Sequence, residues 1–192
     1  MCGMQQYLGI GLVVAGVAAV VLALSWGYVK WAGRHAPALS HPKVASGVGG
    51  ALVLFFIGQI AWLLRALWDI SFALGSLARI AVAVPSKLPE ALMVVMPSAV
   101  ALVLGAVLLW DLGRRRTSFV LGEAIVLLWL MGPVAALCQG WYFHLHLAAF
   151  SVVQLFGWAI LWTLYFAFSP RCALTYGTRR GERIVRTGKL FG

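Results

Sequence analysis

Charged side chains are scarce in this sequence, and acidic ones are the scarcest. Five aspartate and glutamate residues stand against fifteen lysines and arginines, and charged residues make up only 10% of the 192-residue chain. Hydrophobic residues make up 62% of it, above the roughly 45–50% typical of soluble domains. Because so few charges cannot cover that much apolar surface in water, the composition excludes an ordinary soluble fold and indicates a protein of the lipid bilayer.

Cysteine and targeting signals are also sparse. Cys2, Cys138 and Cys172 are the only cysteines in the sequence, and none of them forms a C-x-x-C pair, which excludes a disulfide framework. No basic segment precedes the first apolar run, so we interpret this run as a retained helix rather than a cleaved secretory signal.

Five apolar runs have about the 20 residues that a helix needs to cross the hydrocarbon core. They cover residues 8–29, 47–67, 91–109, 119–138 and 147–168. The sequence therefore predicts an all-α integral membrane protein, a bundle of five transmembrane helices. Residues 70–84 are apolar but too short to cross, and we expect them to lie along the membrane surface or to re-enter it partway.

The positions of the cations predict the orientation of this bundle. With five spans, three basic segments fall on one side of the membrane: the loop at 32–46, the turn at 114–116 and the tail from Arg171. Positive-inside bias then places the N-terminus outside and the C-terminus in the cytoplasm. The net charge of +10 thus reflects topology, and it does not indicate nucleic-acid binding because no basic face alternates with stacking aromatics.

We divide the chain into three regions on this basis. Residues 1–45 hold an extra N-terminal transmembrane helix and a basic cytoplasmic loop, residues 46–178 form a four-helix membrane domain, and residues 179–192 form a basic cytoplasmic tail.

Three segments carry a resemblance to a known family. They are GVGGALVLFFIGQI at residues 47–60, WDLGRRRTSF at 110–119 and WAILWTLYFAFSPRCALTY at 158–176. The first resembles the Gly-Gly-Trp-Leu helix opening, the second the basic turn and the third the closing signature of the domain-of-unknown-function 2569 family of small bacterial inner-membrane proteins. The residues that match the closing signature are Trp162, Tyr165, Phe166, Ser169, Arg171, Thr175 and Tyr176.

The resemblance covers about residues 46–180, with two departures. Ala51 stands where the family has Trp, and the helix at 8–29 is extra. The resemblance implies a four-helix membrane domain in the bacterial inner (cytoplasmic) membrane. It implies no activity, because the activity of the family is unknown.

Polar side chains inside the spans are few, and three of them form a candidate polar path. Glu123 is the only acidic residue within a span, and Gln59 and Gln154 lie mid-span. A membrane-embedded carboxylate can mark a proton or ion pathway, although Glu123 can instead snorkel or pair with the arginines at 114–116. The two glutamines can line the same path or can simply form hydrogen bonds between helices.

His144 and His146 form an H-x-H pair near Cys138 at the predicted outer face. Imidazole and thiolate are good ligands for copper or zinc. However, a spacing of two directs the histidines to different sides of a helix or strand, and no nearby acid orients either ring. Interfacial histidines among aromatic residues are the alternative.

No nucleotide motif and no serine–histidine pair is evident, so we predict a protein without catalytic activity or cofactor. The first hypothesis is an accessory or assembly subunit that docks on a larger membrane protein or on a second copy. Anionic lipids would also contact its cytoplasmic face. The residues that would dock are Arg114, Arg115, Arg116, Arg171, Arg179, Arg180, Arg183, Arg186 and Lys189. The alternatives are a small transporter or channel and, third, metal handling at the periplasmic face.

Overall fold

The structure, a computed structural model, describes residues 2–142 and 149–187, and all the regular elements in these ranges are helices. They are α1 (Cys2–Ala32), α2 (Ala51–Ala83), a 3-10 turn η1 (Pro85–Lys87), α3 (Leu88–Arg114), α4 (Ser118–Trp129), a π-helical turn η2 (Leu130–Val134), α5 (Ala135–Tyr142), α6 (Ala149–Phe168), α7 (Pro170–Thr175) and α8 (Arg179–Thr187). The predicted all-α class is confirmed.

Several of these helices have the length and composition of membrane spans. Four stretches of the described chain qualify, namely Val14–Ala32, Ala51–Ala83, Pro85–Arg114 and Ser118–Cys138, and the stretch Val152–Phe168 is apolar but shorter. The fold therefore fits a multi-pass membrane protein.

Residues 70–84 do not form a separate segment. They continue α2, which runs for 33 residues from Ala51 to Ala83, or about 50 Å at 1.5 Å per residue. The expected surface or re-entrant segment is therefore wrong, because no proline interrupts the helix before Pro85. Pro85 stops α2 and Pro89 occupies the first turn of α3, where a missing N–H costs no helical hydrogen bond.

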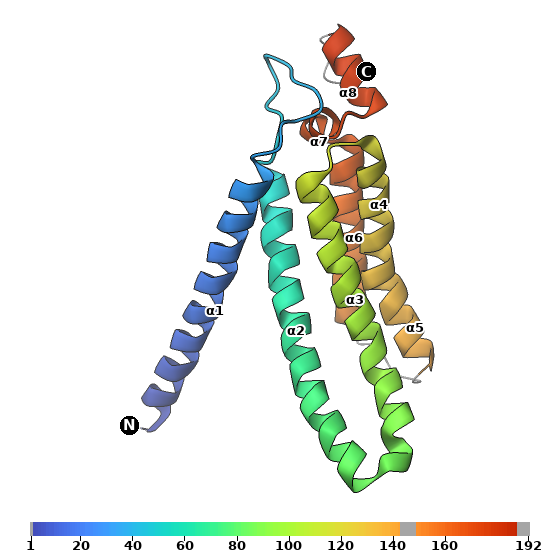
Figure 1. Cartoon of the computed structure of the whole chain (residues 1–192). Helices are drawn as coiled ribbons and strands as arrows, with labels where there is room; N and C mark the ends of the chain where they lie inside the picture. The colour runs from blue at the N-terminus through green and yellow to red at the C-terminus, as the bar shows by residue number, and fades with distance from the viewer. Residues whose placement is uncertain (1, 143–148, 188–192) are drawn as a thin grey trace.

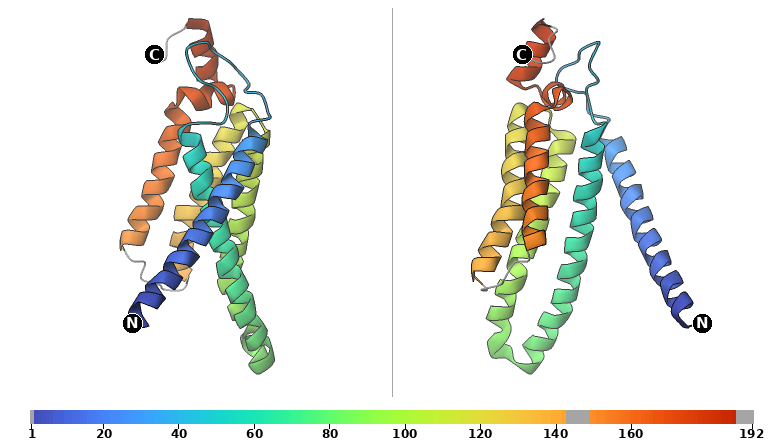
Figure 2. Two further views of the ribbon diagram at one scale, coloured as in Figure 1. Left: turned by 90° about the vertical axis from the view of Figure 1, so that its left-hand side faces the viewer. Right: turned by 180° about the vertical axis from the view of Figure 1, so that it is seen from behind.

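The long helices α2 and α3 form a hairpin against which the other helices pack (Figure 1). On one side of α3 lie α6 and the continuous helix formed by α4, η2 and α5. On the other side, α1 packs on α2 and α3 near its C-terminus and leans away toward its N-terminus (Figures 1 and 2). The hairpin tip extends past the described ends of α5 and α6.

Helices α1 and α3 end, and α2 begins, at the end of the bundle that α7 and α8 cover, which we call the α7 end (Figure 1). Serine 169 and Pro170 form the corner between α6 and α7, and the Ser169 side chain accepts a hydrogen bond from the Cys172 N–H. A serine N-cap followed by proline is a common start for a helix. The core is densest near this end, where Phe55, Leu112 and Tyr176 are fully buried.

Candidate functional site

A cavity of about 570 Å³ lies within the bundle between α2, α3, α6 and the π-helical turn. Its volume is in the range of roughly 300–1,000 Å³ found for ligand pockets. Proline 133 and Gly132 belong to both the turn and the cavity wall. Because proline has no N–H to donate, it disturbs the regular helical bonding here, and single π-helical turns occur frequently at functional sites.

Four polar side chains from three helices ring one level of this cavity. They are Arg65 and Asp69 from α2, Ser98 from α3 and Gln154 from α6, and we call them the polar collar. Arg65 lies about 21 Å from the start of α2, Ser98 about 24 Å from the end of α3, and Gln154 about 21 Å from the end of α6, at 1.5 Å per residue. These helix ends all lie at the α7 end, so the collar residues share a level.

The collar contains an ion pair within one helix. Arg65 and Asp69 are four residues apart on α2, and their closest side-chain atoms, Nε and Oδ2, are 3.8 Å apart. The side chains of Arg65 and Asp69 are 82% and 61% exposed. The contact is long for a charge-assisted bond, so both groups keep capacity for another partner.

Aromatic side chains close the cavity toward the α7 end. The ring of Phe55 from α2 lies 4.9 Å from that of Trp162 and 5.1 Å from that of Phe166, both from α6. The Trp158 ring approaches α2 so closely that a Cβ at Gly58 would lie 2.8 Å from it. We call these four aromatic residues the aromatic floor.

The structure brings together two of the three predicted path residues. Gln59 and Gln154 both line the cavity. Gln59 is 3% exposed, and its Nε2 donates to the Met131 sulfur at 3.7 Å. The contact joins α2 to the π-helical turn through a weak acceptor. Gln154 is exposed, so the two glutamines differ in environment.

Glu123 lies apart from this cavity, because no Glu123 atom is among its lining residues. Its Oε2 atom is buried and accepts no hydrogen bond within the described chain. Of the two alternatives for Glu123, the ion pair with the arginines at 114–116 does not form within the described chain, and Asp111 pairs with Arg115 instead. The Asp111 Oδ1 lies 3.1 Å from the Arg115 Nε, with the Asp111 side chain 8% exposed.

The side chain of Arg116 joins three elements at the α7 end. It donates to the Ala32 carbonyl of α1 and to the Leu112 carbonyl of α3, both at 2.7 Å. Its guanidinium lies over the ring of Tyr176, 5.4 Å from the centroid, and the Tyr176 hydroxyl donates to the Leu112 carbonyl at 2.8 Å. The Arg116 side chain therefore binds groups within the protein. The Arg114 side chain is exposed, and its guanidinium lies over the Trp110 ring.

The loop at 33–50 packs on α7. The Ala38 and Leu39 N–H groups donate to the Thr175 and Leu174 carbonyls at 3.0 and 2.9 Å, and the Gly47 N–H donates to the Thr175 hydroxyl at 2.9 Å. The Gly47–Thr175 contact joins the segment at 47–60 to the segment at 158–176, and the Arg116–Tyr176 contact joins the segment at 110–119 to the same place.

Glycine is required where this loop enters α2. Gly47 and Gly50 have φ angles of 88° and 58°, which favour glycine. The Arg171 guanidinium of α7 occupies the space beside the backbone at Gly49 and Gly50, because a Cβ at either position would contact it. The motif at 47–50 is therefore a close-packing element.

The thiol of Cys172 is buried in α7. Burial raises its pKa to about 11, since a thiolate is poorly solvated there. Burial likewise raises the pKa of the Tyr176 hydroxyl, against the opposing effect of Arg116. Both groups are therefore protonated at neutral pH, which suits structural roles.

The C-terminal cations have different environments. Arg180 donates to the Phe168 and Ala167 carbonyls at the end of α6. Arg179, Arg183 and Arg186 are exposed on α8 and form no ion pair in the part of the chain that the structure describes. Lys189 lies outside the described residues.

The predicted metal site falls partly outside the structure. His144 and His146 lie outside the described residues, and Cys138 is exposed near the end of the span. Within 2–142 and 149–187, no three histidine, cysteine, aspartate or glutamate residues form a metal-binding group.

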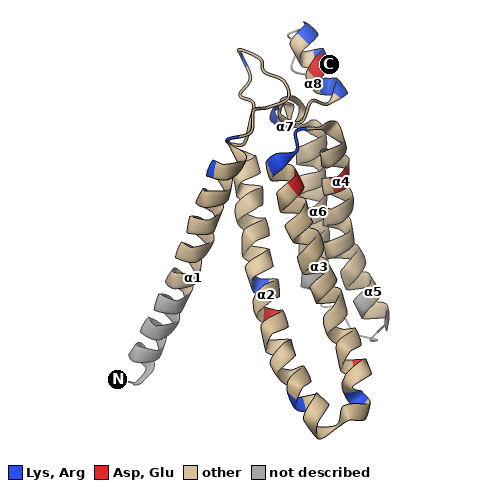
Figure 3. Cartoon of the chain, viewed as in Figure 1, with Lys and Arg blue, Asp and Glu red and all other residues tan. Residues whose placement is uncertain are grey.

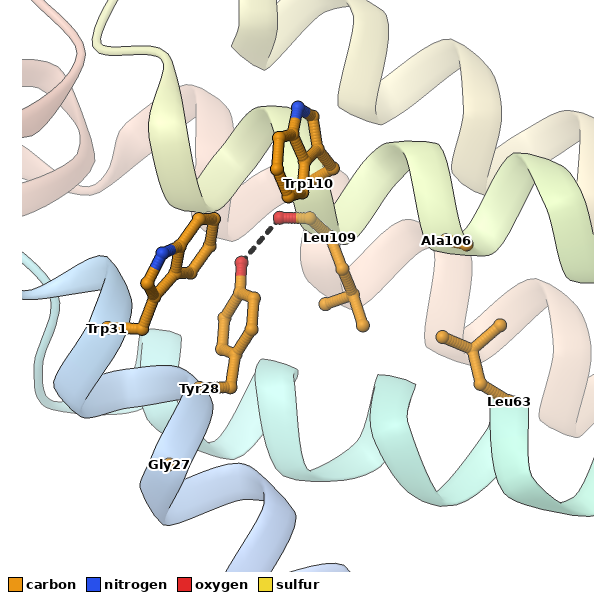
Figure 4. Close-up of a pocket in the computed structure, with 7 residues that line it drawn as sticks. All are labelled: Gly27, Tyr28, Trp31, Leu63, Ala106, Leu109 and Trp110. Atoms are coloured by element: carbon orange, nitrogen blue, oxygen red, sulfur yellow. Dashed lines mark hydrogen bonds between the residues drawn. The ribbon is translucent and has the colours of Figure 1, made fainter.

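An apolar groove of about 450 Å³ opens where α1 diverges from the hairpin (Figure 4). The hydroxyl of Tyr28 donates to the Leu109 carbonyl across it. The residues that line the groove are Gly27, Tyr28, Trp31, Leu63, Ala106, Leu109 and Trp110. None of these lining residues is charged, so among the described residues the groove contrasts with the cavity inside the bundle.

Comparisons with protein-family models, curated proteins and solved structures find no match to this chain. Its geometry is therefore the basis for a functional proposal. Sequence reasoning did not identify Asp111 or the polar residues Arg65, Asp69 and Ser98 as parts of a site. Proline 133 was a usable signal for the cavity, because a proline within a membrane span frees backbone groups.

Proposed function

We propose that this chain is a multi-pass protein of the bacterial inner membrane with five spans, the N-terminus outside and the C-terminus in the cytoplasm. The spans are α1, α2, α3, the continuous α4–η2–α5 and α6. The cations of the loop at 33–50, the end of α3 and α8 gather at the α7 end (Figure 3), which suits the positive-inside rule. Membership of the resembling family is part of this proposal.

We further propose that the protein is a non-catalytic accessory or assembly subunit of a larger membrane complex. The observation that carries this proposal is the length of the α2–α3 hairpin. At 33 residues, α2 extends about 50 Å, whereas the hydrocarbon core is about 30 Å thick. A typical tilt of about 20° shortens this length by only a few ångströms.

The hairpin tip is apolar as well as long. Val82 is 87% exposed and Phe72 is 67% exposed. The tip also carries Arg79 and the ion pair between Lys87 and Glu90, which favour water or head groups over hydrocarbon. Exposed apolar surface among charges is typical of a protein–protein contact, so a membrane partner would cover the tip.

The experiment that tests this proposal is purification of a tagged copy, expressed at native level, in mild detergent, with mass spectrometry of what accompanies it. A stoichiometric membrane-protein partner supports the accessory function. A homo-oligomer without a companion contradicts it and favours the second candidate described below.

Substitutions at the hairpin tip test whether the partner binds there. We expect the double substitution Phe72→Ser and Val82→Ser to release the partner without unfolding the bundle, because both side chains are exposed. The matched control is Phe119→Ser, which changes a 74% exposed residue at the opposite end.

Replacing Arg179, Arg183 and Arg186 of α8 by glutamate tests the other predicted contact in the same experiment, since an acidic partner surface would then be repelled. Retention of the partner by both sets of variants would contradict docking at either site.

A small transporter or channel is the second candidate, and the cavity with Gln59 and Gln154 favours it. The aromatic floor would have to open for a solute to pass. Flux into proteoliposomes tests this candidate. Proton-coupled flux that disappears with Glu123→Gln supports it, and unchanged flux removes Glu123 from any mechanism. Metal handling through Cys138, His144 and His146 is the third, and metal analysis of the purified protein tests it.

A further inference from the structure

The cavity beside the π-helical turn has a polar end and an apolar end. The polar collar lies about 21–27 Å from the α7 end at 1.5 Å per residue, and the aromatic floor lies nearer to that end. Between them the wall is mostly apolar, from residues such as Trp62, Ala101 and Leu155. In a hydrocarbon core about 30 Å thick, the collar is near the head groups of the far leaflet. Trp158, the floor residue farthest from the α7 end, is near the midplane, and the rest of the floor lies in the near leaflet.

A phospholipid of the far leaflet, like the cavity, is polar at the membrane surface and apolar toward the midplane. Its head group lies at the surface and its acyl chains point to the midplane. We infer that the cavity binds one zwitterionic phospholipid, with its head group at the polar collar and an acyl chain against the apolar wall. This inference requires that the helices span a bilayer, but it does not depend on a partner protein.

The charges at the collar favour a zwitterionic head group over an anionic one. Arg65 and Asp69 are the only charged residues among those that line the cavity, so their charges sum to zero. An ammonium and a phosphate on one head group can satisfy the carboxylate and the guanidinium together. An anionic head group would repel the Asp69 carboxylate and would offer it no cationic partner.

Side-chain exposure gives the ligand a route into the cavity from the membrane. Gln154 is exposed and Trp158 is 39% exposed on α6, and Arg65 and Asp69 are exposed on α2. Lipid can therefore reach the collar between α2 and α6. The aromatic floor stops it from going deeper.

Native mass spectrometry of the full chain, exchanged into detergent with defined lipids, tests the inference. The probes are phosphatidylethanolamine, phosphatidylglycerol and the acyl-free head group glycerophosphoethanolamine. We expect one phosphatidylethanolamine per chain, retained about tenfold more tightly than phosphatidylglycerol, since one unpaired charge is at stake. We expect no competition from the acyl-free head group.

Substitutions at the collar should change the preference in opposite directions. Asp69→Asn leaves a net positive collar and should invert the preference toward phosphatidylglycerol, whereas Arg65→Gln should weaken phosphatidylglycerol further. An inverted preference cannot result from unfolding. The matched control is Arg79→Gln, which removes an exposed arginine of α2 outside the cavity. It should leave the retention of both lipids unchanged.

Three outcomes would overturn the inference. They are equal retention of both lipids by the unchanged protein, the same preference in the Asp69→Asn variant, and displacement of lipid by glycerophosphoethanolamine. The last would identify a site for a water-soluble solute.

Discussion

Replacement of Arg116 by alanine is expected to loosen the α7 end of the bundle. The substitution removes three hydrogen bonds from a charged donor, to the Ala32 and Leu112 carbonyls and, at 3.4 Å, to the Tyr176 hydroxyl, as well as the contact with the Tyr176 ring. One hydrogen bond to a charged group contributes about 1.5–3 kcal/mol. Because Arg116 is only half-buried, we expect the substitution to lower the free energy of unfolding by about 2–3 kcal/mol in all. The melting temperature in detergent should fall by about 5–10 °C.

The neighbouring arginine provides the control for this prediction. Arg114 has the same charge and lies two residues earlier, but its guanidinium is exposed and contacts only the Trp110 ring within the described chain. Arg114→Ala should therefore cost about 1 kcal/mol or less. Arg116→Lys should resemble Arg116→Ala, because a compact ammonium lacks the planar fork whose two nitrogens reach the Leu112 and Ala32 carbonyls. Equal melting temperatures for the two alanine variants would show that these hydrogen bonds contribute little.

Replacement of Gly113 by valine is expected to separate α1 from the rest of the bundle. A Cβ at Gly113 would lie 2.7 Å from the Tyr28 hydroxyl and would also collide with the Trp31 ring. Both of these side chains belong to α1 and make its main aromatic contacts, with Phe56 and Trp110. Overpacking of this kind costs about 1–3 kcal/mol, and moving α1 aside would relieve it.

Thermal unfolding and protease access to the loop at 33–50 measure this effect. We expect a lower melting temperature and faster cleavage of the loop in the Gly113→Val variant. Gly122→Val on α4 makes the same change of residue type where a Cβ has no neighbour within 4 Å, so it isolates the collision from helix propensity. Faster cleavage in both variants, or in neither, would contradict a role for Gly113 in holding α1.

The sequence predicted the fold class because composition and hydrophobic run length are strong signals in a membrane protein. The sequence-based prediction was wrong at residues 70–84. It assumed that a helix ends after the roughly 20 residues needed for one span, whereas α2 continues to Ala83. Pro85 was the true end signal. Run length indicates how much of a chain lipid can accept, whereas Pro85 marks where α2 ends.

The site was harder to predict because it depends on which helices are neighbours. Gln59 and Gln154 are 95 residues apart in the sequence, and only the packing of α2, α6 and the π-helical turn places them at one cavity. The sequence singled out Glu123 because it is the one acidic residue within a predicted span. In the structure, Asp111 is the acid that pairs with Arg115. The spacing of these two acids from the arginines distinguishes them, because Asp111 is four residues before Arg115 on one helix, a spacing that favours an ion pair, whereas Glu123 lies on the next helix.

The contacts of α7 also have a consequence for the order in which the protein matures. Arg116 and the loop at 33–50 find their partners Thr175 and Tyr176 only in a later part of the chain. During translation, which proceeds from the N-terminus, the earlier helices enter the membrane before this closure exists. A nascent chain shorter than about residue 176 would therefore leave that loop and that guanidinium without these partners, available to an insertion factor or to a quality-control protease.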